Sequence, residues 1–298
     1  MGGDMSNAIL TEDEVSNRLS NLPVFFIGGL PRSGTTWVQQ LLNHHPNLVC
    51  LGESHFVNDL VPNIATVTNQ YRQKRSQNFR TWAPSVKAPE GSLILPILRA
   101  AFISIIQANI GDKNVSELLA IGEKTPDNIL HLKRILSIYP NVYFIHVIRD
   151  GRDSAISAYT RFKSKLPKDK IRSEYIKDFA KEWSSRISIS REIMRDSQRY
   201  IEVRYEDMHE SPETEVNRML SFLQVDNSED CISKCINAST FESLSGGRKR
   251  GEVDNNSHYR RGEIGGWKDS LTENEVRDFE MIAAETMRAL GYNRYYKD

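Results

Sequence analysis

The sequence predicts an α/β protein in which a P-loop-like, doubly wound parallel sheet is flanked by helices within a single domain. Two observations predict this class. Five short apolar runs alternate with segments of helical periodicity, and the first run leads into a Gly/Ser/Thr-rich turn with the glycine spacing of a phosphate-binding loop. The chain has 298 residues, 39% of them hydrophobic, which is enough for one large domain. We assign residues 1–20 to a flexible, polar N-terminal arm.

Five short apolar runs are the candidate strands. Runs of this kind are typical of parallel strands that are buried on both faces of a sheet. Because ligands bind such sheets at the carboxyl ends of the strands, we expect the functional residues to follow the runs in sequence. The predicted strands are Val24–Gly28, Leu48–Leu51, Leu118–Ile121, Tyr143–Ile148 and Tyr200–Tyr205.

Helix starts are marked by capping residues. Thr125-Pro126-Asp127 and Ser211-Pro212-Glu213 each place an N-cap residue before a proline at the first helical position. Residues Thr272 to Glu275 form a capping box that opens the last helix. Apolar residues recur on one face of two helices, and we assign them to the core: Ile176, Phe179, Trp183, Ile187 and Met194 in the first, and Val276, Phe279, Ile282, Ala283 and Met287 in the second.

The composition excludes several classes of function. Lysine plus arginine equal aspartate plus glutamate at 39 each, so the chain lacks the net basic field typical of nucleic-acid binding. Cys50, Cys231 and Cys235 form neither a disulfide framework nor a metal-ligand pattern, and we interpret them as buried free thiols. No His/Cys/Asp cluster has ligand spacing, so we expect no metal. No stretch is apolar enough to span a bilayer and no signal peptide is evident, so we expect no membrane anchor and a cytoplasmic location.

The first strand candidate runs into the segment FFIGGLPRSGTTW, residues 25–37. Gly29, Gly34 and Thr36 match the P-loop pattern, but Thr35 stands where the P-loop has its lysine. A basic residue, Arg32, lies inside the turn instead. Such a turn aims backbone N–H groups at one point, and the helix that follows adds its positive dipole end. The loop therefore predicts a phosphate site, but not one for the terminal phosphates of ATP.

Two further segments give the loop its context. Residues 142–157 read VYFIHVIRDGRDSAIS, an apolar run that ends at Arg149 before a polar helix start, and residues 258–272 read HYRRGEIGGWKDSLT. Together with PRSGTTW, these segments resemble, in order and spacing, the signatures of sulfotransferases that use 3′-phosphoadenosine 5′-phosphosulfate (PAPS). The resemblance covers roughly residues 23–267, with Arg261 where the family has lysine. It implies that residues 21–298 form a sulfotransferase domain.

The resemblance implies a role for each matching residue. The loop would hold the 5′-phosphosulfate, while Arg149 and Ser157 would bind the 3′-phosphate. Ser33, Gly34, Thr35 and Thr36 would offer N–H and hydroxyl donors to phosphate oxygens. The remaining implied contacts to the cofactor are Trp37 against the adenine, Tyr205 near the base, and Arg260, Arg261 and Gly262 over the 3′-phosphate, with Arg248 as a further candidate.

Sulfuryl transfer defines the catalytic candidates. An acceptor hydroxyl displaces adenosine 3′,5′-bisphosphate (PAP) in line, so the protein must position both groups and neutralise growing negative charge. Arg32 and Lys124 match the family residues for this task. The Lys-x-His of small-molecule sulfotransferases reads Lys124-Thr125-Pro126 here, and proline cannot accept a proton. In tyrosylprotein sulfotransferases a Gly-Glu-Glu-Thr segment supplies the base, and by that comparison we assign the base to Glu53, with His55 as the alternative.

Two stretches without a periodic pattern are assigned to the surroundings of this site. Residues 66–89 are polar with scattered aromatic side chains, and residues 243–265 are rich in Gly and Arg. Long irregular loops within a compact domain are usually functional or disordered. We interpret the first as a wall of the acceptor site and the second as a lid over the cofactor.

Two other functions compete with sulfuryl transfer. A P-loop kinase or NTPase is disfavoured by Thr35 and by the lack of a clear strand-ending Walker B aspartate, because Asp150 lies within the 3′-phosphate segment. A binding protein with a decayed site is disfavoured by the presence of Arg32, Glu53 and Lys124. The expected acceptor is a hydroxyl of a small molecule, carbohydrate, lipid or protein. Its identity and the oligomeric state stay open.

Overall fold

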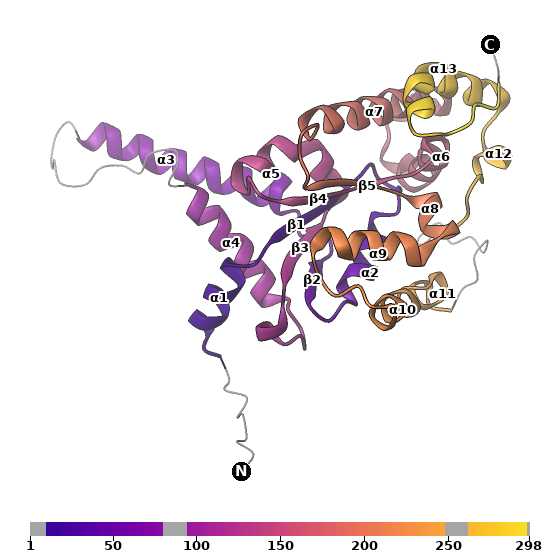
Figure 1. Ribbon diagram of the computed structural model, residues 1–298. Coiled ribbons are helices and arrows are strands. Elements are labelled where there is room, and N and C mark those ends of the chain that lie inside the picture. Colours follow the sequence, from indigo (N-terminus) through magenta and orange to yellow (C-terminus); the bar gives the residue numbers. More distant parts are fainter. Residues whose placement is uncertain (1–9, 80–93, 248–261, 297–298) are drawn as a thin grey trace.

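The computed structural model describes residues 10–79, 94–247 and 262–296, which form a parallel sheet between helices (Figure 1). The sheet has five strands in the order β2-β3-β1-β4-β5, and every neighbouring pair is parallel. The chain leaves β1 towards β2 and leaves β4 towards β5, so the connections of these two adjacent strands diverge and open a crevice at their carboxyl ends. The strands are β1 (Val24–Gly28), β2 (Leu48–Leu51), β3 (Ala120–Lys124), β4 (Tyr143–Ile148) and β5 (Tyr200–Arg204).

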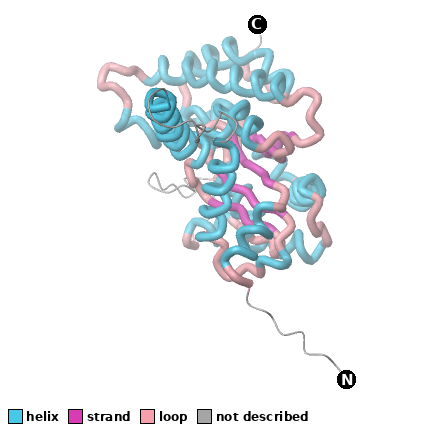
Figure 2. The backbone as a smooth tube through the Cα atoms, turned by 90° about the vertical axis from the view of Figure 1, so that its left-hand side faces the viewer, coloured by secondary structure: helices cyan, strands magenta, loops and turns pink. Residues whose placement is uncertain are grey.

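Helices cover both faces of this sheet, as the view in Figure 2 also shows. The α-helices of the described chain are α1 (Glu12–Ser20), α2 (Thr35–Asn43), α3 (Val61–Phe79), α4 (Ile94–Ala108), α5 (Leu132–Ile138), α6 (Gly151–Phe162), α7 (Arg172–Ile193), α8 (Tyr205–Glu210), α9 (Pro212–Leu223), α10 (Glu229–Ala238), α11 (Phe241–Ser245), α12 (Trp267–Ser270) and α13 (Glu273–Ala289). Four short helical segments complete the described chain: η1 (Phe56–Leu60), η3 (Val115–Glu117), η4 (Pro126–His131) and η5 (Lys163–Lys165).

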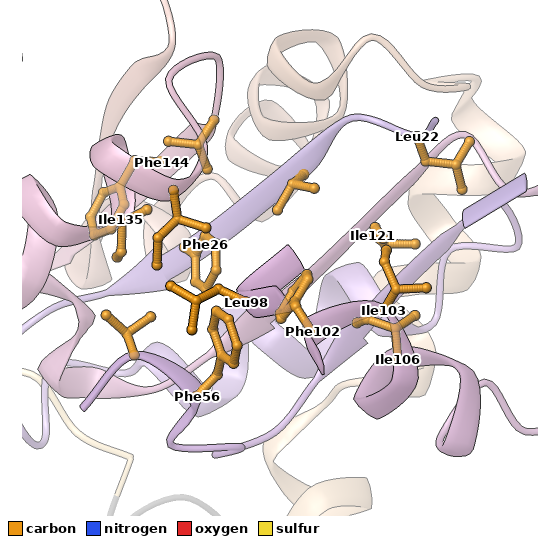
Figure 3. Packing of buried hydrophobic residues seen from close by; sticks show 14 of the residues in the cluster. Leu22, Phe26, Phe56, Leu98, Phe102, Ile103, Ile106, Ile121, Ile135 and Phe144 are labelled. Atoms are coloured by element: carbon orange, nitrogen blue, oxygen red, sulfur yellow. The ribbon is translucent and has the colours of Figure 1, made fainter. Parts of the chain in front are cut away.

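Three groups of buried apolar side chains hold these layers together. Under α1, α4 and α5, one face of the sheet contributes Phe26 and Phe144, which pack with Phe56 and Phe102 (Figure 3). The opposite face packs against α2, α9 and α10. A third group joins α6, α7 and α13, and it contains Trp183 and other members of the helix faces expected from the sequence. Of those predicted positions, Phe179 and Ile282 are only partly buried, and the other eight are buried.

The sequence prediction of the strands needs two corrections. The third strand is Ala120–Lys124 rather than Leu118–Ile121, so Glu123 and Lys124 belong to the sheet, and Lys124 pairs with Ile27 of β1. Charged residues at the end of a buried strand are unusual, and here they are stabilised by the polar contacts described below. The fifth strand ends at Arg204, and Tyr205 instead begins α8.

Two segments expected to be irregular are helical. Residues 12–20, assigned to a flexible arm, form α1 with a complete Thr11–Glu14 capping box and a fully buried Leu19, while residues 1–9 lie outside the described part. Residues 66–79 belong to α3, which projects away from the sheet (Figure 1). Because α3 leaves side chains such as Val67 and Tyr71 exposed, it needs no apolar stripe, and its sequence therefore shows no helical period. The rest of that stretch, residues 80–89, lies outside the described part.

The remaining expectations about local structure fare better. Thr272 and Glu275 form the predicted capping box of α13. Helix α9 begins at Pro212 after Ser211, but the Ser211 side chain makes no capping hydrogen bond. The three cysteines are free and buried, as predicted. Within the described ranges, no helix has the length and apolar character needed to cross a membrane.

Candidate active site

A cavity of about 480 Å³ lies over the carboxyl ends of the strands. Residues that follow every strand of the sheet line it: the loop after β1, Glu53 and His55 after β2, residues 125–127 after β3, Arg149 after β4, and Tyr205 after β5. This is the place where a doubly wound sheet binds its ligands. Five segments that lie far apart in sequence, one after each strand, therefore meet at one site.

The loop after β1 has the backbone of an anion-binding turn. Arg32 and Gly34 have positive φ angles of 73° and 99°, and Gly34 is the N-cap of α2 without any side chain capping the helix. Among the described residues, no side chain caps the first N–H groups of α2, and the dipole of the helix favours an anion there. Gly34 is also required by packing, because a Cβ atom at this position would lie 2.5 Å from the Tyr205 ring.

Two arginines and a serine form the basic end of the cavity. Arg32 donates from Nε to Ser157 Oγ at 3.1 Å. The Arg149 guanidinium donates to the carbonyl oxygens of Arg32 at 3.3 Å and Glu263 at 2.7 Å, and it lies 4.5 Å from the centre of the Tyr205 ring. Burial alone would lower the pKa of Arg149, but Tyr205 and the neighbouring carboxylates raise it, so the guanidinium stays charged. Residues from the first two signature segments thus converge as the sequence predicted.

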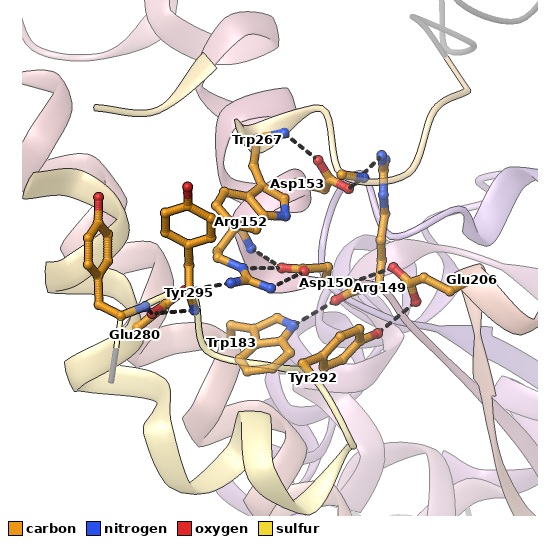
Figure 4. Close-up of polar contacts among 12 residues, drawn as sticks. Arg149, Asp150, Arg152, Asp153, Trp183, Glu206, Trp267, Glu280, Tyr292 and Tyr295 are labelled. Carbon is orange, nitrogen blue, oxygen red and sulfur yellow. Dashed lines mark hydrogen bonds and ion pairs between the residues drawn. The ribbon is translucent and has the colours of Figure 1, made fainter. Parts of the chain in front are cut away.

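Asp153 connects this end to the C-terminal segment (Figure 4). Its carboxylate accepts hydrogen bonds from the backbone N–H groups of Gly265 at 2.8 Å and Trp267 at 2.9 Å, and it lies 3.7 Å from the Arg149 guanidinium. Desolvation raises the pKa of Asp153, against the effect of Arg149. Asp153 therefore holds residues 265–267 close to Arg149, which was predicted to bind the 3′-phosphate.

Asp150 has a different role from that of a metal-binding aspartate. It accepts hydrogen bonds from Arg152 at both carboxylate oxygens, 3.0 Å from Nε and 2.7 Å from Nη2 (Figure 4). Arg152 also pairs with the buried Glu280 at 2.5 Å. Asp150 does not line the cavity. Its carboxylate is committed to this structural network.

Glu53 and Lys124 form the other polar centre of the site. Lys124 Nζ lies 2.7 Å from Glu53 Oε1 and donates to Thr36 Oγ1 at 3.1 Å. Lys124, the last residue of β3, is buried behind Glu53, whereas Glu53 lines the cavity. His55 also lines it, with Nε2 3.9 Å from Glu53 Oε2 and Nδ1 accepting from Asn58 at 3.1 Å. Both candidates for the base therefore face the same space.

The buried carboxylate of Glu123 holds the residues around Glu53 and Lys124 in place. Glu123 accepts hydrogen bonds from Asn128 at 2.7 Å, Thr125 at 2.9 Å and Ser54 at 3.0 Å. Burial raises the pKa of Glu123, although these hydrogen bonds lower it. The Thr125 hydroxyl is used here, and it makes no capping hydrogen bond to η4, in contrast to the sequence prediction. The network ties the loop that carries Glu53 to the end of β3.

Aromatic side chains form one wall of the cavity. Trp37 donates from Nε1 to Ser239 O at 3.0 Å, and its ring lies 4.7 Å from that of His209. Phe241 also lines the cavity, and a Cβ atom at Gly262, whose φ is 68°, would lie 2.7 Å from the Phe241 ring. Trp37 and Gly262 are thus at the cavity as predicted. Arg248, Arg260 and Arg261 lie outside the described residues.

The sequence identified most of the lining residues but not all of them. Ser33 differs from its prediction, because it is buried beneath the loop, with its hydroxyl making no hydrogen bond within the described part of the chain, and it does not line the cavity. Among the lining residues that the sequence analysis did not assign to the site are Asp127, Asp153, Arg161, Phe162, Lys165, His209 and Phe241. Helical spacing from Arg149 was an available signal for Asp153, Arg161 and Lys165.

Comparison with known proteins agrees with this geometry. A model described as the sulfotransferase family matches residues 23–230, more than two thirds of the chain. The chain belongs to the sulfotransferase family. It is 26% identical over 220 residues to the protein-tyrosine sulfotransferase of Drosophila melanogaster, covering 72% of this chain and 41% of that protein. With protein-tyrosine sulfotransferase A of Caenorhabditis elegans it shares 26% identity over 292 residues, covering 94% of this chain and 70% of that protein.

Solved sulfotransferase structures share the fold. Mouse sulfotransferase SULT7A1, complexed with PAP, superposes with a TM-score of 0.54 at 16% identity, covering 93% of this chain and 89% of that chain. The sulfotransferase domain from the Curacin biosynthetic pathway gives 0.51 at 15% identity, covering 91% and 98%. The predicted fold class and family are therefore confirmed. Across the described ranges, no group of three or more His, Cys, Asp or Glu side chains is arranged to hold a metal ion.

Proposed function

We propose that this sulfotransferase moves the sulfuryl group of PAPS to a hydroxyl group of its acceptor. The observation that carries this proposal is the convergence of Arg32, Arg149 and Ser157 beside the uncapped start of α2. A site with two guanidinium groups and free helical N–H groups suits a ligand with two separate phosphate groups. Membership of the sulfotransferase family and the PAP bound to the mouse relative support the same ligand.

The lining residues offer partners for each part of PAPS. The N–H groups of residues 34–36 and the side chain of Arg32 would hold the 5′-phosphosulfate end, and Arg149 and Ser157 the 3′-phosphate. Trp37 and Phe241 offer aromatic surface for the adenine. PAPS supplies the activated sulfuryl group, and the protein supplies position and charge. The Arg149 guanidinium donates to the Glu263 carbonyl, so the described end of the C-terminal signature segment lies beside the proposed 3′-phosphate site.

Glu53 and Lys124 carry the chemistry in this proposal. Glu53 faces the cavity with a carboxylate that can take the proton of the acceptor hydroxyl. Lys124, 2.7 Å from Glu53 and 3.1 Å from Thr36, lies between the base and the phosphate loop, where its charge stabilises negative charge that develops during transfer. His55, 3.9 Å from Glu53, is the alternative base.

A nucleoside triphosphate fits the site less well. Thr35 replaces the lysine that would contact the terminal phosphates, and Asp150, the strand-ending aspartate, is bound to Arg152 outside the cavity. The geometry therefore favours a sulfotransferase over a kinase or NTPase. The intact Glu53–Lys124 pair likewise favours a working enzyme over a binding protein.

Thermal stability measured with added nucleotides tests the cofactor assignment. PAP without magnesium should raise the melting temperature, because a ligand present at about 100 times its Kd stabilises the folded state by about 2.7 kcal/mol. ATP with magnesium at the same concentration should leave it unchanged. Transfer from labelled PAPS to a panel of phenols and sugars then tests catalysis. Stabilisation by ATP with magnesium and none by PAP would refute the proposal.

A further inference from the structure

His55 lines the cavity from a backbone conformation that few residues other than glycine adopt. Its φ is 52°, in the left-handed region, and the π-helical turn η1 begins directly after it. Both features are uncommon, and both are found disproportionately at functional sites. Among the described residues, only Arg32 and Gln224 share a positive φ without being glycine, and Arg32 also lines the cavity. The strain at His55 therefore lies at the site itself, beside the proposed base.

Hydrogen bonds from two directions hold His55 in this conformation. Its N–H donates to Thr125 Oγ1 at 3.3 Å, and the Thr125 hydroxyl in turn donates to the buried Glu123. On the other side, the His55 carbonyl accepts from the N–H groups of Asp59 at 2.9 Å and Leu60 at 3.4 Å. The end of β3 and the turn η1 thus fix the backbone of His55, which leaves the ring to be oriented by its own contacts.

Asn58 orients the ring and determines which of its nitrogens carries the hydrogen. Asn58 Nδ2 donates to His55 Nδ1 at 3.1 Å, while Asn58 Oδ1 is buried and accepts no hydrogen bond within the described part of the chain. With the amide reversed, its NH₂ group would be buried without a partner instead, and an orphaned N–H is rarer in protein interiors than an orphaned carbonyl oxygen. A neutral imidazole that accepts at Nδ1 carries its hydrogen on Nε2.

This Nε2–H group faces the free oxygen of the proposed base. Glu53 Oε1 is paired with Lys124 at 2.7 Å, and the other oxygen, Oε2, lies 3.9 Å from His55 Nε2. That separation is too long for a direct hydrogen bond, but a single oxygen atom placed between the two can lie within about 3 Å of both. The pair therefore forms a seat for one oxygen, with an acceptor on one side and a donor on the other.

We propose that His55 is the hydrogen-bond donor that positions the acceptor oxygen, with Asn58 as the positioning residue that keeps the hydrogen on Nε2. This inference rests on the proposed function. The acceptor hydroxyl gives its proton to Glu53 Oε2 as its oxygen bonds to sulfur, and the bond from sulfur to the 5′-phosphate oxygen breaks, with its electron pair leaving on PAP. His55 neither gains nor loses a proton. Its Nε2–H directs the oxygen and stabilises the negative charge that develops there.

Nuclear magnetic resonance of the ring nitrogens tests the tautomer without any turnover. The protein is labelled with ¹⁵N-histidine and saturated with PAP, and the His55 signals are identified by their absence in His55→Gln. Protonated and bare ring nitrogens resonate far apart. At alkaline pH, where imidazole is neutral, we expect a bare Nδ1 and a protonated Nε2. A bare Nε2 would overturn the inference, because His55 could then accept a proton but not donate a hydrogen bond to the acceptor.

A pair of variants at position 55 tests the donor by activity. Glutamine extends an N–H group towards the position of Nε2, whereas methionine has a similar length and no donor, and neither can act as a base. Transfer from PAPS to the most reactive member of the panel of phenols and sugars is measured as kcat/KM. His55→Met should lose about 3- to 10-fold, the effect of one hydrogen bond, and His55→Gln should recover part of that loss. Melting temperatures and PAP affinity control for folding and for the cofactor site.

Replacement of Asn58 by aspartate reverses the tautomer. The new carboxylate accepts from Nδ1–H, so the neutral ring has a bare Nε2, and at alkaline pH kcat/KM should fall towards the value of His55→Met. If His55 were the base, the same variant should retain or gain activity, because its Nε2 would then be free to take a proton. Asn63→Asp is the matched control, since it adds the same charge at an exposed asparagine of α3 outside the cavity and should leave turnover unchanged.

Three kinetic results would overturn the inference while the proposed function stands. The first is a loss of about 100-fold or more in both His55→Gln and His55→Met, which is the effect of removing a base. The second is parental activity in His55→Met, and the third is a gain of activity in Asn58→Asp. Failure of the proposed function looks different, because the parent protein would then neither bind PAP nor transfer from PAPS to any member of the panel.

Discussion

Replacement of Arg149 by alanine tests directly whether this residue binds the 3′-phosphate of the cofactor. In the structure the guanidinium is largely buried, with 13% of its side chain exposed, and it contacts the Arg32 and Glu263 carbonyl groups and the Tyr205 ring. These contacts fix its position on the side of the loop that faces Ser157. A 3′-phosphate bound there would meet a charge that is already oriented.

The size of the effect follows from this setting. A hydrogen bond to a charged group contributes about 1.5–3 kcal/mol, which corresponds to about 10- to 150-fold in affinity. Arg149→Ala should therefore weaken PAP binding by at least about tenfold. The Asp153 carboxylate, 3.7 Å from the guanidinium, would lose its cation and repel the phosphate, which pushes the loss towards the upper end. Arg149→Lys retains the charge without the two-pronged geometry and should lose less.

Calorimetry with two nucleotides separates this effect from general damage. Adenosine 5′-phosphosulfate lacks the 3′-phosphate, so its affinity should be nearly the same in the parent and in Arg149→Ala. A melting temperature measured without ligand controls for folding. Equal losses for PAP and adenosine 5′-phosphosulfate would refute the assignment, because Arg149 would then support the site as a whole rather than bind the 3′-phosphate.

Three further predictions concern the Glu53 centre and the buried Glu123 beside it. Glu53→Gln keeps the size of the side chain but removes its basicity, so turnover should fall by about 10²–10⁴-fold. Its PAP affinity should be unchanged, and an acidic phenol such as 4-nitrophenol should partly restore turnover. Normal turnover in this variant, together with an inactive but folded His55→Ala, would assign the base to His55 instead. Lys124→Ala should reduce turnover for 4-nitrophenol as well, because it removes charge stabilisation rather than the base. Burial raises the pKa of Glu123 above its ordinary value of 4.5, so the folded state holds this proton more tightly than the unfolded state, and the contribution to stability is lost as the pH rises through the raised pKa. Relative to the parent, Glu123→Gln should therefore gain in melting temperature as the pH rises above 4.5, and a constant difference between the two would contradict the shift.

The fold was predictable because most elements obey local rules. The strands β1 and β2 are continuous apolar runs, and helices such as α13 begin with a capping box and carry a buried face. The misjudged elements break these rules for physical reasons. Helix α3 projects from the body and needs no apolar stripe, and β3 ends in Glu123 and Lys124, whose burial depends on partners from other segments. Local patterning carries no information about such partners.

The site was predictable to the extent that its residues lie in contiguous motifs. Of the predicted residues, Arg149, Ser157 and Gly262 line the cavity, as do the loop residues other than the buried Ser33. Contacts between distant segments were not predictable from one sequence. Asp153 binds Gly265, 112 residues away, and Lys124 binds Glu53, 71 residues away. The aromatic wall likewise joins α2, α8 and α11, which only the folded chain brings together.

The two buried cations of the site, Lys124 and Arg149, are each paired with a carboxylate, but the two carboxylates differ in their other contacts. Lys124 and Arg149 each lie beside a carboxylate, Glu53 and Asp153, and this pairing offsets the cost of burying an isolated charge before any anionic ligand is present. Asp153 accepts hydrogen bonds from two backbone N–H groups, so it holds the C-terminal segment in place. The Glu53 side chain is 35% exposed and faces the cavity. Of the two carboxylates, only Glu53 is open to an acceptor, and this difference makes it the one suited to take a proton.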